Sequence, residues 1–201
     1  MALAPGNAQV LRDYGCFAVW MDRTDAGIAA GRRAIVLDPL NRRTHDGLGQ
    51  ALYYSRRYDE AIAAFQDTLA LDPDFPTPYG NRGLAYFALR NFAAALASCE
   101  IKPDFWLNQT CLAVTYDKLG RHADAEAVLA KLIAVQGNDS AFQYGEIYAQ
   151  WGDNAKALEW LSTALSLHDA GVVTLKTDPL LDPLREQPRF QALERSLKFP
   201  G

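Results

Sequence analysis

Residues 48–73 read LGQALYYSRRYDEAIAAFQDTLALDP, and this stretch decides the fold because its pattern recurs along the chain. Pro39 and Pro73 are separated by 34 residues, as are Gly49 and Gly83. Small residues recur at the same step at Gly27, Ala61 and Ala95. A period of about 20 to 50 residues indicates a solenoid, in which each unit buries its apolar face only against its neighbours. We therefore expect a function in binding along an extended concave surface rather than in catalysis.

The unit at residues 42–75 resembles the tetratricopeptide repeat, a pair of antiparallel helices with the pattern W-x2-L-G-x2-Y, then A-x3-F, then a proline. The residues that carry the resemblance are Leu48, Gly49, Leu52, Ala61, Phe65 and Pro73. Related positions match over about residues 2–167. The resemblance implies an all-α fold, a right-handed α-solenoid of helix-turn-helix pairs that ends in a capping helical tail.

We expect five repeat units between a remnant of a preceding repeat and this tail. The remnant is expected at residues 1–7, where Ala2–Pro5 read as the last turn of a helix and suggest a chain that begins inside a repeat. The tail is expected at residues 168–201. The units are expected at residues 8–41, 42–75, 76–105 (shortened), 106–137 and 138–167.

Small residues are predicted to sit where the two helices of a unit cross, because only a minimal side chain lets two helix axes approach closely. On the first helices these residues are Gly15, Gly49, Gly83 and Gly145. On the second helices they are Gly27, Ala61, Ala95, Ala125 and Ala157. The third unit departs from the period, since Pro73 and Pro103 are only 30 residues apart. We therefore expect a short helix near residues 92–101.

The tail has its own pattern. Asp178-Pro179 and Asp182-Pro183 each read as an N-cap followed by proline at the first helical position. An amphipathic helix from about residue 188 is predicted to cover the edge of the last repeat with Phe190, Leu193 and Leu197. The tail also resembles the ending of repeat arrays in bacterial multidomain regulators, where such arrays follow class III adenylyl cyclase, winged-helix or serine/threonine kinase domains. That resemblance implies a regulatory or scaffolding part of a larger bacterial protein.

The composition argues against several classes of partner. The chain has 201 residues and a net charge of −4, so no basic face is expected for nucleic acid or for an anionic membrane. Its longest apolar stretches fall short of the ~18 residues that a membrane helix needs, and its first residues do not read as a signal peptide. We expect a cytoplasmic protein. The three scattered cysteines are interpreted as small, reduced core residues.

No catalytic or metal-binding pattern is found. His45, His122 and His168 lack the spacing that places two ligands on one helix face, and no glycine-rich phosphate loop or G-x-S-x-G elbow is present. We therefore expect no enzymatic activity, no metal and no cofactor. The carboxylate clamp of some chaperone-binding arrays is also not expected. Asn81 matches one clamp position, but Asp46 and Gln50 stand where cations or asparagine are wanted.

The remaining candidate is the groove. In the family that the chain resembles, the inner surface comes from one face of each first helix. The corresponding residues are Arg12, Cys16, Val19, Arg43, Asp46, Gln50, Tyr53, Asn81, Leu84, Phe87, Thr110, Val114, Asp117, Phe142 and Glu146. Such a surface suits an extended or helical peptide with one or two bulky anchors. Alternatively, aromatic residues such as Tyr53 and Phe87 only pack against neighbouring units.

Two other functions stay open at this point. In one, the array associates with a second copy of itself through its N-terminal edge. In the other, it is the sensory C-terminal region of a nucleotide cyclase or a transcription regulator.

Overall fold

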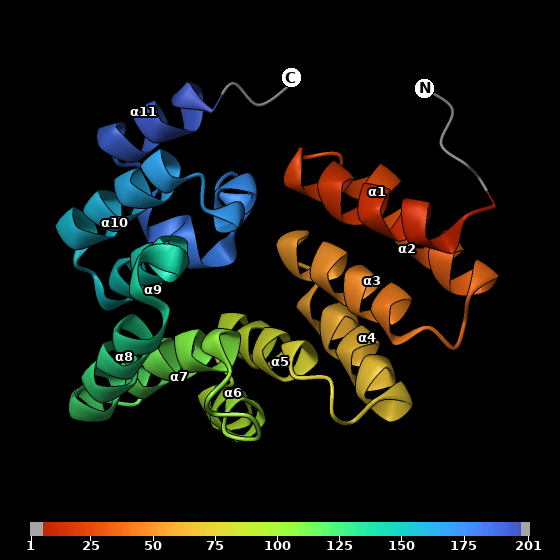
Figure 1. Ribbon diagram of the computed structural model, residues 1–201, viewed down its shortest axis with the longest axis horizontal. Coiled ribbons are helices and arrows are strands. Elements are labelled where there is room, and N and C mark those ends of the chain that lie inside the picture. Colours follow the sequence, from red (N-terminus) through yellow and green to blue (C-terminus); the bar gives the residue numbers. More distant parts are fainter. Residues whose placement is uncertain (1–5, 198–201) are drawn as a thin grey trace.

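The computed structural model describes residues 6–197, which contain helices and no strand. Five helix pairs follow one another along a curved arc (Figure 1). The pairs are α1 (Ala8–Trp20) with α2 (Thr24–Leu37), α3 (Arg42–Tyr54) with α4 (Tyr58–Leu71), α5 (Thr77–Ala88) with α6 (Phe92–Cys99), α7 (Trp106–Lys118) with α8 (His122–Gln136), and α9 (Ala141–Trp151) with α10 (Asn154–Leu167). The predicted all-α solenoid is therefore confirmed.

The two helices of a pair approach closely at the predicted small residues. A Cβ atom added at Gly27 would lie 2.5 Å from the carbonyl oxygen of Gly15. One added at Gly49 would lie 2.5 Å from the ring of Phe65, and one added at Gly145 would lie 2.7 Å from Leu161. No larger residue fits these crossings without movement, so the periodic glycines fix how the helices of each pair pack.

The third pair contains the predicted short helix, since α6 has only eight residues. Its end places Cys99 beside Cys111 of α7, and these two residues form a disulfide with a Cα–Cα distance of 6.2 Å. A Cβ atom at Gly83 would overlap both sulfur atoms, so glycine makes room for the bridge. The interpretation of all three cysteines as reduced is therefore wrong for this pair. The fold brings together residues that lack a recognised spacing, and Cys16 is left as a free thiol.

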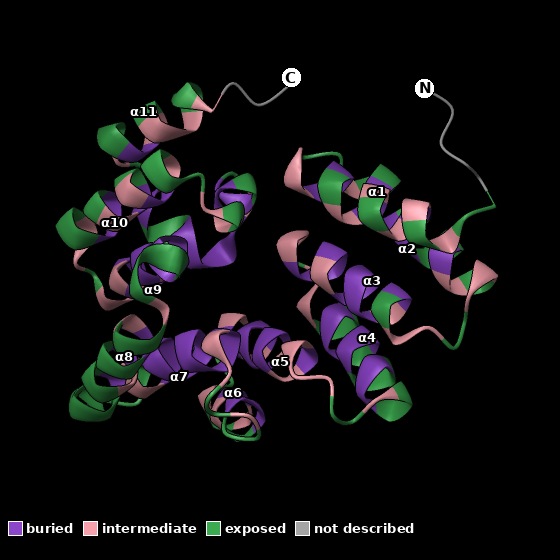
Figure 2. Ribbon diagram, viewed as in Figure 1, coloured by how far each residue is buried: buried purple, intermediate pink, exposed green. Residues whose placement is uncertain are grey.

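Burial is greatest along the inner helices. Every residue of α7 from Leu107 to Thr115 is buried, whereas α8 and α10 expose much of their outer faces (Figure 2). Among residues 6–197, no helix combines the length and apolar character needed to cross a membrane. The predicted helix remnant at Ala2–Pro5 lies outside the described residues.

The tail consists of the short helices η2 (Ala170–Thr174) and η3 (Pro179–Leu184) and the helix α11 (Pro188–Ser196). Phe190 of α11 is fully buried in a cluster with Leu161 and Ala164 of α10, which confirms the predicted cap on the last repeat. Before α11, however, the chain runs along the inner side of the arc, where η3 packs against α9 (Figure 1). The tail thus contributes to the concave side, which the sequence did not predict.

The two predicted N-caps of the tail differ in outcome. Asp178 caps η3, because its carboxylate accepts a hydrogen bond from the Leu180 amide at 2.8 Å. The prediction for Asp182 is wrong, since Pro183 lies inside η3 and no helix starts there. The Asp182 carboxylate is instead bound by Arg56, far away in the sequence.

Candidate functional site

The largest group of predicted groove residues surrounds one cavity on the concave side, which we call the central cavity. Its volume is about 450 Å³, and it lies between α1, α3, α5, α7, α9 and the tail. First helices of different units supply the lining residues that the sequence identified. These are Gln50, Tyr53, Asn81, Leu84, Phe142 and Glu146. Residues far apart in the sequence are therefore brought to one site, as the repeat pattern predicts.

Two further cavities hold other predicted residues. The N-terminal cavity, of about 500 Å³, is lined by Arg12, Cys16, Arg43, Asp46 and Gln50. The turn cavity, of about 370 Å³, lies where Tyr53 and Phe87 face the tail residues Leu180 and Asp182.

Four predicted groove residues line none of these three cavities. Val19, Thr110 and Val114 are completely buried within the helix packing. Asp117 lies in the last turn of α7, where its carboxylate is 2.9 Å from Nδ1 of His122.

The aromatic residues pack and line cavities at the same time. Only 3% of Tyr53 and 8% of Phe87 is exposed. Tyr53 contacts Tyr58 with ring centroids 5.8 Å apart, and Phe87 contacts Phe92 at 5.5 Å. Truncation of either ring would therefore disturb the core as well as the cavity wall.

Two carboxyl groups meet in the central cavity. Glu146 comes from α9 and Asp178 from the tail, and both are buried. Burial raises the pKa of Glu146 well above its ordinary value, and the neighbouring Asp178 raises it further. Burial also raises the pKa of Asp178, although a hydrogen bond from Glu146 opposes this shift. In both carboxyl groups burial therefore favours the protonated form.

The N-terminal cavity holds a second buried carboxyl group. Burial raises the pKa of Asp46 to about 6, although Gln50 donates a hydrogen bond of 2.9 Å to its carboxylate. Burial, with the nearby Asp46 charge, raises the pKa of the Cys16 thiol to about 12. Such a thiol is a poor nucleophile, because the thiolate is the reactive form. Within residues 6–197, no group of three His, Cys, Asp or Glu side chains is placed to hold a metal ion.

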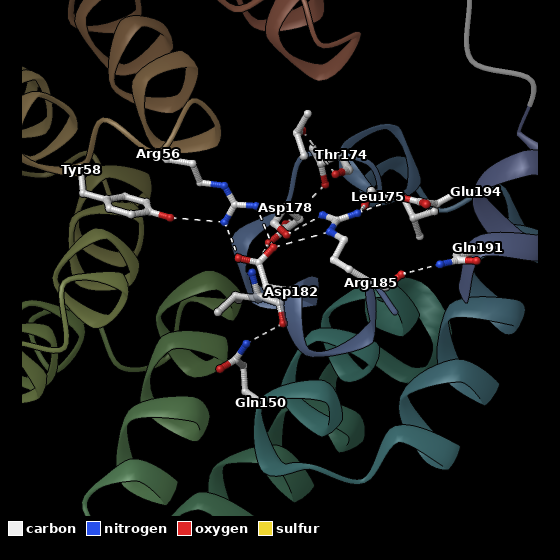
Figure 3. Close-up of polar contacts among 12 residues, drawn as sticks. Arg56, Tyr58, Gln150, Thr174, Leu175, Asp178, Asp182, Arg185, Gln191 and Glu194 are labelled. Carbon is white, nitrogen blue, oxygen red and sulfur yellow. Dashed lines mark hydrogen bonds and ion pairs between the residues drawn. The ribbon is translucent and has the colours of Figure 1, made fainter. Parts of the chain in front are cut away.

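The tail is held across the concave side by a polar cluster (Figure 3). Arg56 donates two hydrogen bonds of 2.7 Å to the Asp182 carboxylate and a third, of 3.3 Å, to the Tyr58 hydroxyl. The Gln150 side chain donates to the Leu180 carbonyl at 2.6 Å. Behind them, Arg185 donates to the carbonyl of Asp178 at 3.0 Å. These contacts fix η3 between the α3–α4 turn and α9.

Sequence reasoning missed the tail residues and several aromatic side chains of the central cavity. Trp20 ends α1 and Trp106 begins α7, and neither stands at a helix position from which a groove residue was predicted. The tail contributes Asp169, Thr174 and Asp178. The sequence does contain a signal for these tail residues, because they are polar residues within an otherwise apolar segment. A cap that only covers a helix edge does not need buried carboxylates.

Comparison with known proteins agrees with the repeat pattern. The family model described as tetratricopeptide repeat matches residues 47–103 and 112–171. A thermophilic tetratricopeptide repeat protein of Thermus thermophilus is 17% identical, with a TM-score of 0.66, over 94% of this chain and 98% of that one. PilW, a type IV pilus biogenesis factor, is 21% identical, with a TM-score of 0.58, over 90% of this chain and 84% of that one.

A third similar structure is that of YrrB, described as a tetratricopeptide repeat protein with an unusual peptide-binding site. It is 17% identical, with a TM-score of 0.50, over 86% of this chain and 92% of that one. At these identities the structures show a common fold. No curated protein sequence gives a significant match.

Proposed function

Since the chain belongs to the tetratricopeptide repeat family, we propose that this interaction module binds a peptide or protein segment on its concave side and has no catalytic activity of its own. The central cavity carries the proposal. It gathers side chains from α3, α5 and α9 around about 450 Å³, within the range of about 300–1,000 Å³ typical of ligand sites.

The chemistry of the cavity suits a segment with one bulky anchor. Apolar and aromatic walls from Leu84, Trp106 and Phe142 stand beside amide groups of Gln50 and Asn81. Apolar walls give affinity, while a few polar groups orient the bound backbone. The description of YrrB as having a peptide-binding site supports the same use of this fold. The N-terminal and turn cavities extend the surface that a longer segment would cover.

The test is site-specific photo-cross-linking in living cells. A photoreactive phenylalanine replaces Gln143, a half-buried residue of the central cavity, or Glu159, an exposed residue of α10 that lines none of the three concave cavities. We expect a partner adduct from position 143 and none from position 159. The captured partner, purified, should then bind the unmodified chain. Equal adducts from both positions, or adducts only from position 159, would contradict binding on the concave side.

Self-association is a second candidate, and it is favoured by exposed apolar residues in the first repeat. Phe17 is 53% exposed, Val36 68% and Leu40 80%. A second copy that covered them would form a dimer without any other partner. Light scattering over a range of concentrations tests this, with Leu40→Glu as the variant that should remain monomeric. A wild-type chain that is monomeric at every concentration removes this candidate.

We also propose a cellular role and consider in which compartment the protein acts. The tail's resemblance to endings of bacterial regulators supports a regulatory or scaffolding role within a larger protein, including the sensory region of a cyclase or transcription regulator. The sequence alone favours the cytoplasm. The Cys99–Cys111 disulfide favours an oxidising compartment instead, because disulfides seldom persist among cytosolic thiols. Localisation of a tagged full-length product decides between them.

A further inference from the structure

We propose that the central cavity is a cation site, which takes the ammonium or guanidinium group of a lysine or arginine side chain. The peptide origin of that cation rests on the proposed function. The preference for positive charge does not, because it follows from the residues of the cavity itself.

The first observation is the charge of the cavity wall. Among the described residues, four with carboxyl groups line it, and no Lys, Arg or His does. They are Asp139, Glu146, Asp169 and Asp178. Asp169 caps the start of α9 by accepting from the Phe142 amide at 3.0 Å, so it has a structural role. Glu146 and Asp178 are the two that face each other, and both are buried.

The two arginines whose charges act on Asp178 lie outside the cavity lining and already have other partners. Arg56 is bound to Asp182, and Arg185 donates to Glu194 at 2.8 Å and to the Leu175 carbonyl at 2.9 Å. Asp178 receives hydrogen bonds from the Leu180 amide and, at 3.5 Å, from the Thr174 hydroxyl. Two buried carboxyl groups without a cation between them are costly to keep charged. An ammonium or guanidinium group would supply the missing positive charge and several N–H donors.

An independent observation concerns the Tyr53 hydroxyl. This residue is 97% buried (3% exposed), lines the central cavity, and its hydroxyl has no hydrogen-bond partner among the described residues. Burial raises the pKa of Tyr53, and the charges of Asp178 and Glu146 raise it as well. A buried phenol is normally paired, so its oxygen is an available acceptor for an N–H group of a ligand.

The remaining walls also suit an organic cation. Trp20, Tyr54, Trp106 and Phe142 contribute aromatic rings, whose faces attract positive charge. The four carboxyl residues disfavour an anion. A metal ion is not favoured, because no three candidate ligand side chains converge within residues 6–197. A lysine or arginine side chain therefore fits this cavity better than either alternative.

The test is a titration followed by the indole N–H signals in two-dimensional NMR. N-acetyl-lysine methylamide is compared with N-acetyl-norleucine methylamide, which has nearly the same shape but no charge. We expect the lysine compound to shift the signals of Trp20 and Trp106, and to leave Trp151, whose indole donates to the Ala113 carbonyl, in place. Equal shifts with the norleucine compound, or shifts spread evenly over all indoles, would overturn the cation site.

A matched pair of variants gives the second arm. Glu146→Gln keeps the shape of the side chain but cannot ionise beside a bound cation, and Glu159→Gln makes the same change on the exposed side of α10. We expect about a tenfold loss of affinity for the lysine compound in the first variant and none in the second, as for loss of one charged hydrogen bond. Unchanged affinity in a folded Glu146→Gln variant would also overturn the proposal.

These experiments distinguish a peptide side chain from a free amine as the source of the cation. They also distinguish failure of the cation site from failure of the proposed function. Tighter binding of the lysine compound than of 1,5-diaminopentane supports a peptide side chain, whereas the reverse order supports a site for a free amine. If both compounds bind but cross-linking at position 143 captures no partner, the cation site stands and the proposed function fails. If a partner is captured there but neither compound binds, the proposed function stands and the cation site fails.

Discussion

Arg56 and Asp182 lie 126 residues apart in the sequence, yet two parallel hydrogen bonds of 2.7 Å join the guanidinium group to the carboxylate. A second link, between Lys176 and Asp22 at 3.4 Å, ties the tail to the turn between α1 and α2. The tail thus connects the last repeat to the turns of the first two. It serves both as a cap for α10 and as one wall of the central cavity, so groove shape depends on the tail staying in place.

Loss of the Arg56–Asp182 pair is expected to increase local opening of the tail, while the free energy of unfolding of the whole chain changes little. Both side chains are partly exposed, so we expect Asp182→Asn to lower the free energy of unfolding by only about 0.5–1 kcal/mol. Amide exchange at Leu180 and Leu181 should speed up by a larger factor than exchange in α7. Adding Arg56→Gln to this variant should cost little more, because the pair acts as a unit. Fully additive effects in this double-mutant cycle would contradict the clamp.

A recurring backbone conformation at the turns offers a stabilising change. One residue of the turn within each helix pair has a positive φ. In the first three pairs it is Asp22 at 64°, Arg56 at 63° and Arg90 at 60°, whereas in the last two it is Gly120 and Gly152. An L-residue is strained there and glycine is not.

We therefore expect Arg90→Gly to raise the free energy of unfolding by about 0.5 kcal/mol, since relief of strain exceeds the added flexibility of the unfolded chain. Urea denaturation measures it. Arg23→Gly, at a φ of −98°, is the control and should lower stability. A loss of stability in Arg90→Gly would show that the arginine side chain outweighs the strain.

The disulfide gives an expectation that mass spectrometry can check. Unfolded without a reductant, the chain should take up one N-ethylmaleimide, at Cys16, and after reduction it should take up three. Reduction should lower the free energy of unfolding by about 3 kcal/mol, since the bridge closes a loop of 12 residues. Cys16→Ser should leave this loss unchanged. Three adducts without prior reduction would show that the bridge is not formed.

The sequence predicts the helix contacts that recur in each repeat, but it does not predict contacts that occur only once in the chain. Gly49 and Gly83 were predictable because each crossing needs the same small residue. The short α6 followed from the missing residues before Pro103, but its consequence, Cys99 beside Cys111, depends on where that helix ends in space. The central cavity was half predictable. Its first-helix residues recur at matching positions of the repeats, whereas Asp178 comes from the tail, whose course no repeat defines.

Buried acidic groups should make stability fall as pH rises, and Asp46 allows this to be measured alone. Its pKa of about 6 in the folded chain exceeds the ordinary 3.8, so between these values the folded state holds a proton that the unfolded state has released. Below about pH 3.8 both states are protonated and burial has no effect. Above about pH 6 the folded state must carry a buried charge, at a cost of up to about 3 kcal/mol.

Asp46→Asn keeps an acceptor for the 2.9 Å hydrogen bond from Gln50 but cannot become charged. We therefore expect the variant to match the wild type near pH 3.5 and to be about 1–3 kcal/mol more stable at pH 7.5. Urea denaturation at both pH values measures this difference. Glu126→Gln, on the exposed face of α8, should show no such rise. If instead Asp46→Asn is the less stable protein at pH 7.5, then its carboxylate is stabilised there by Arg12 and Arg43, whose charges oppose the effect of burial.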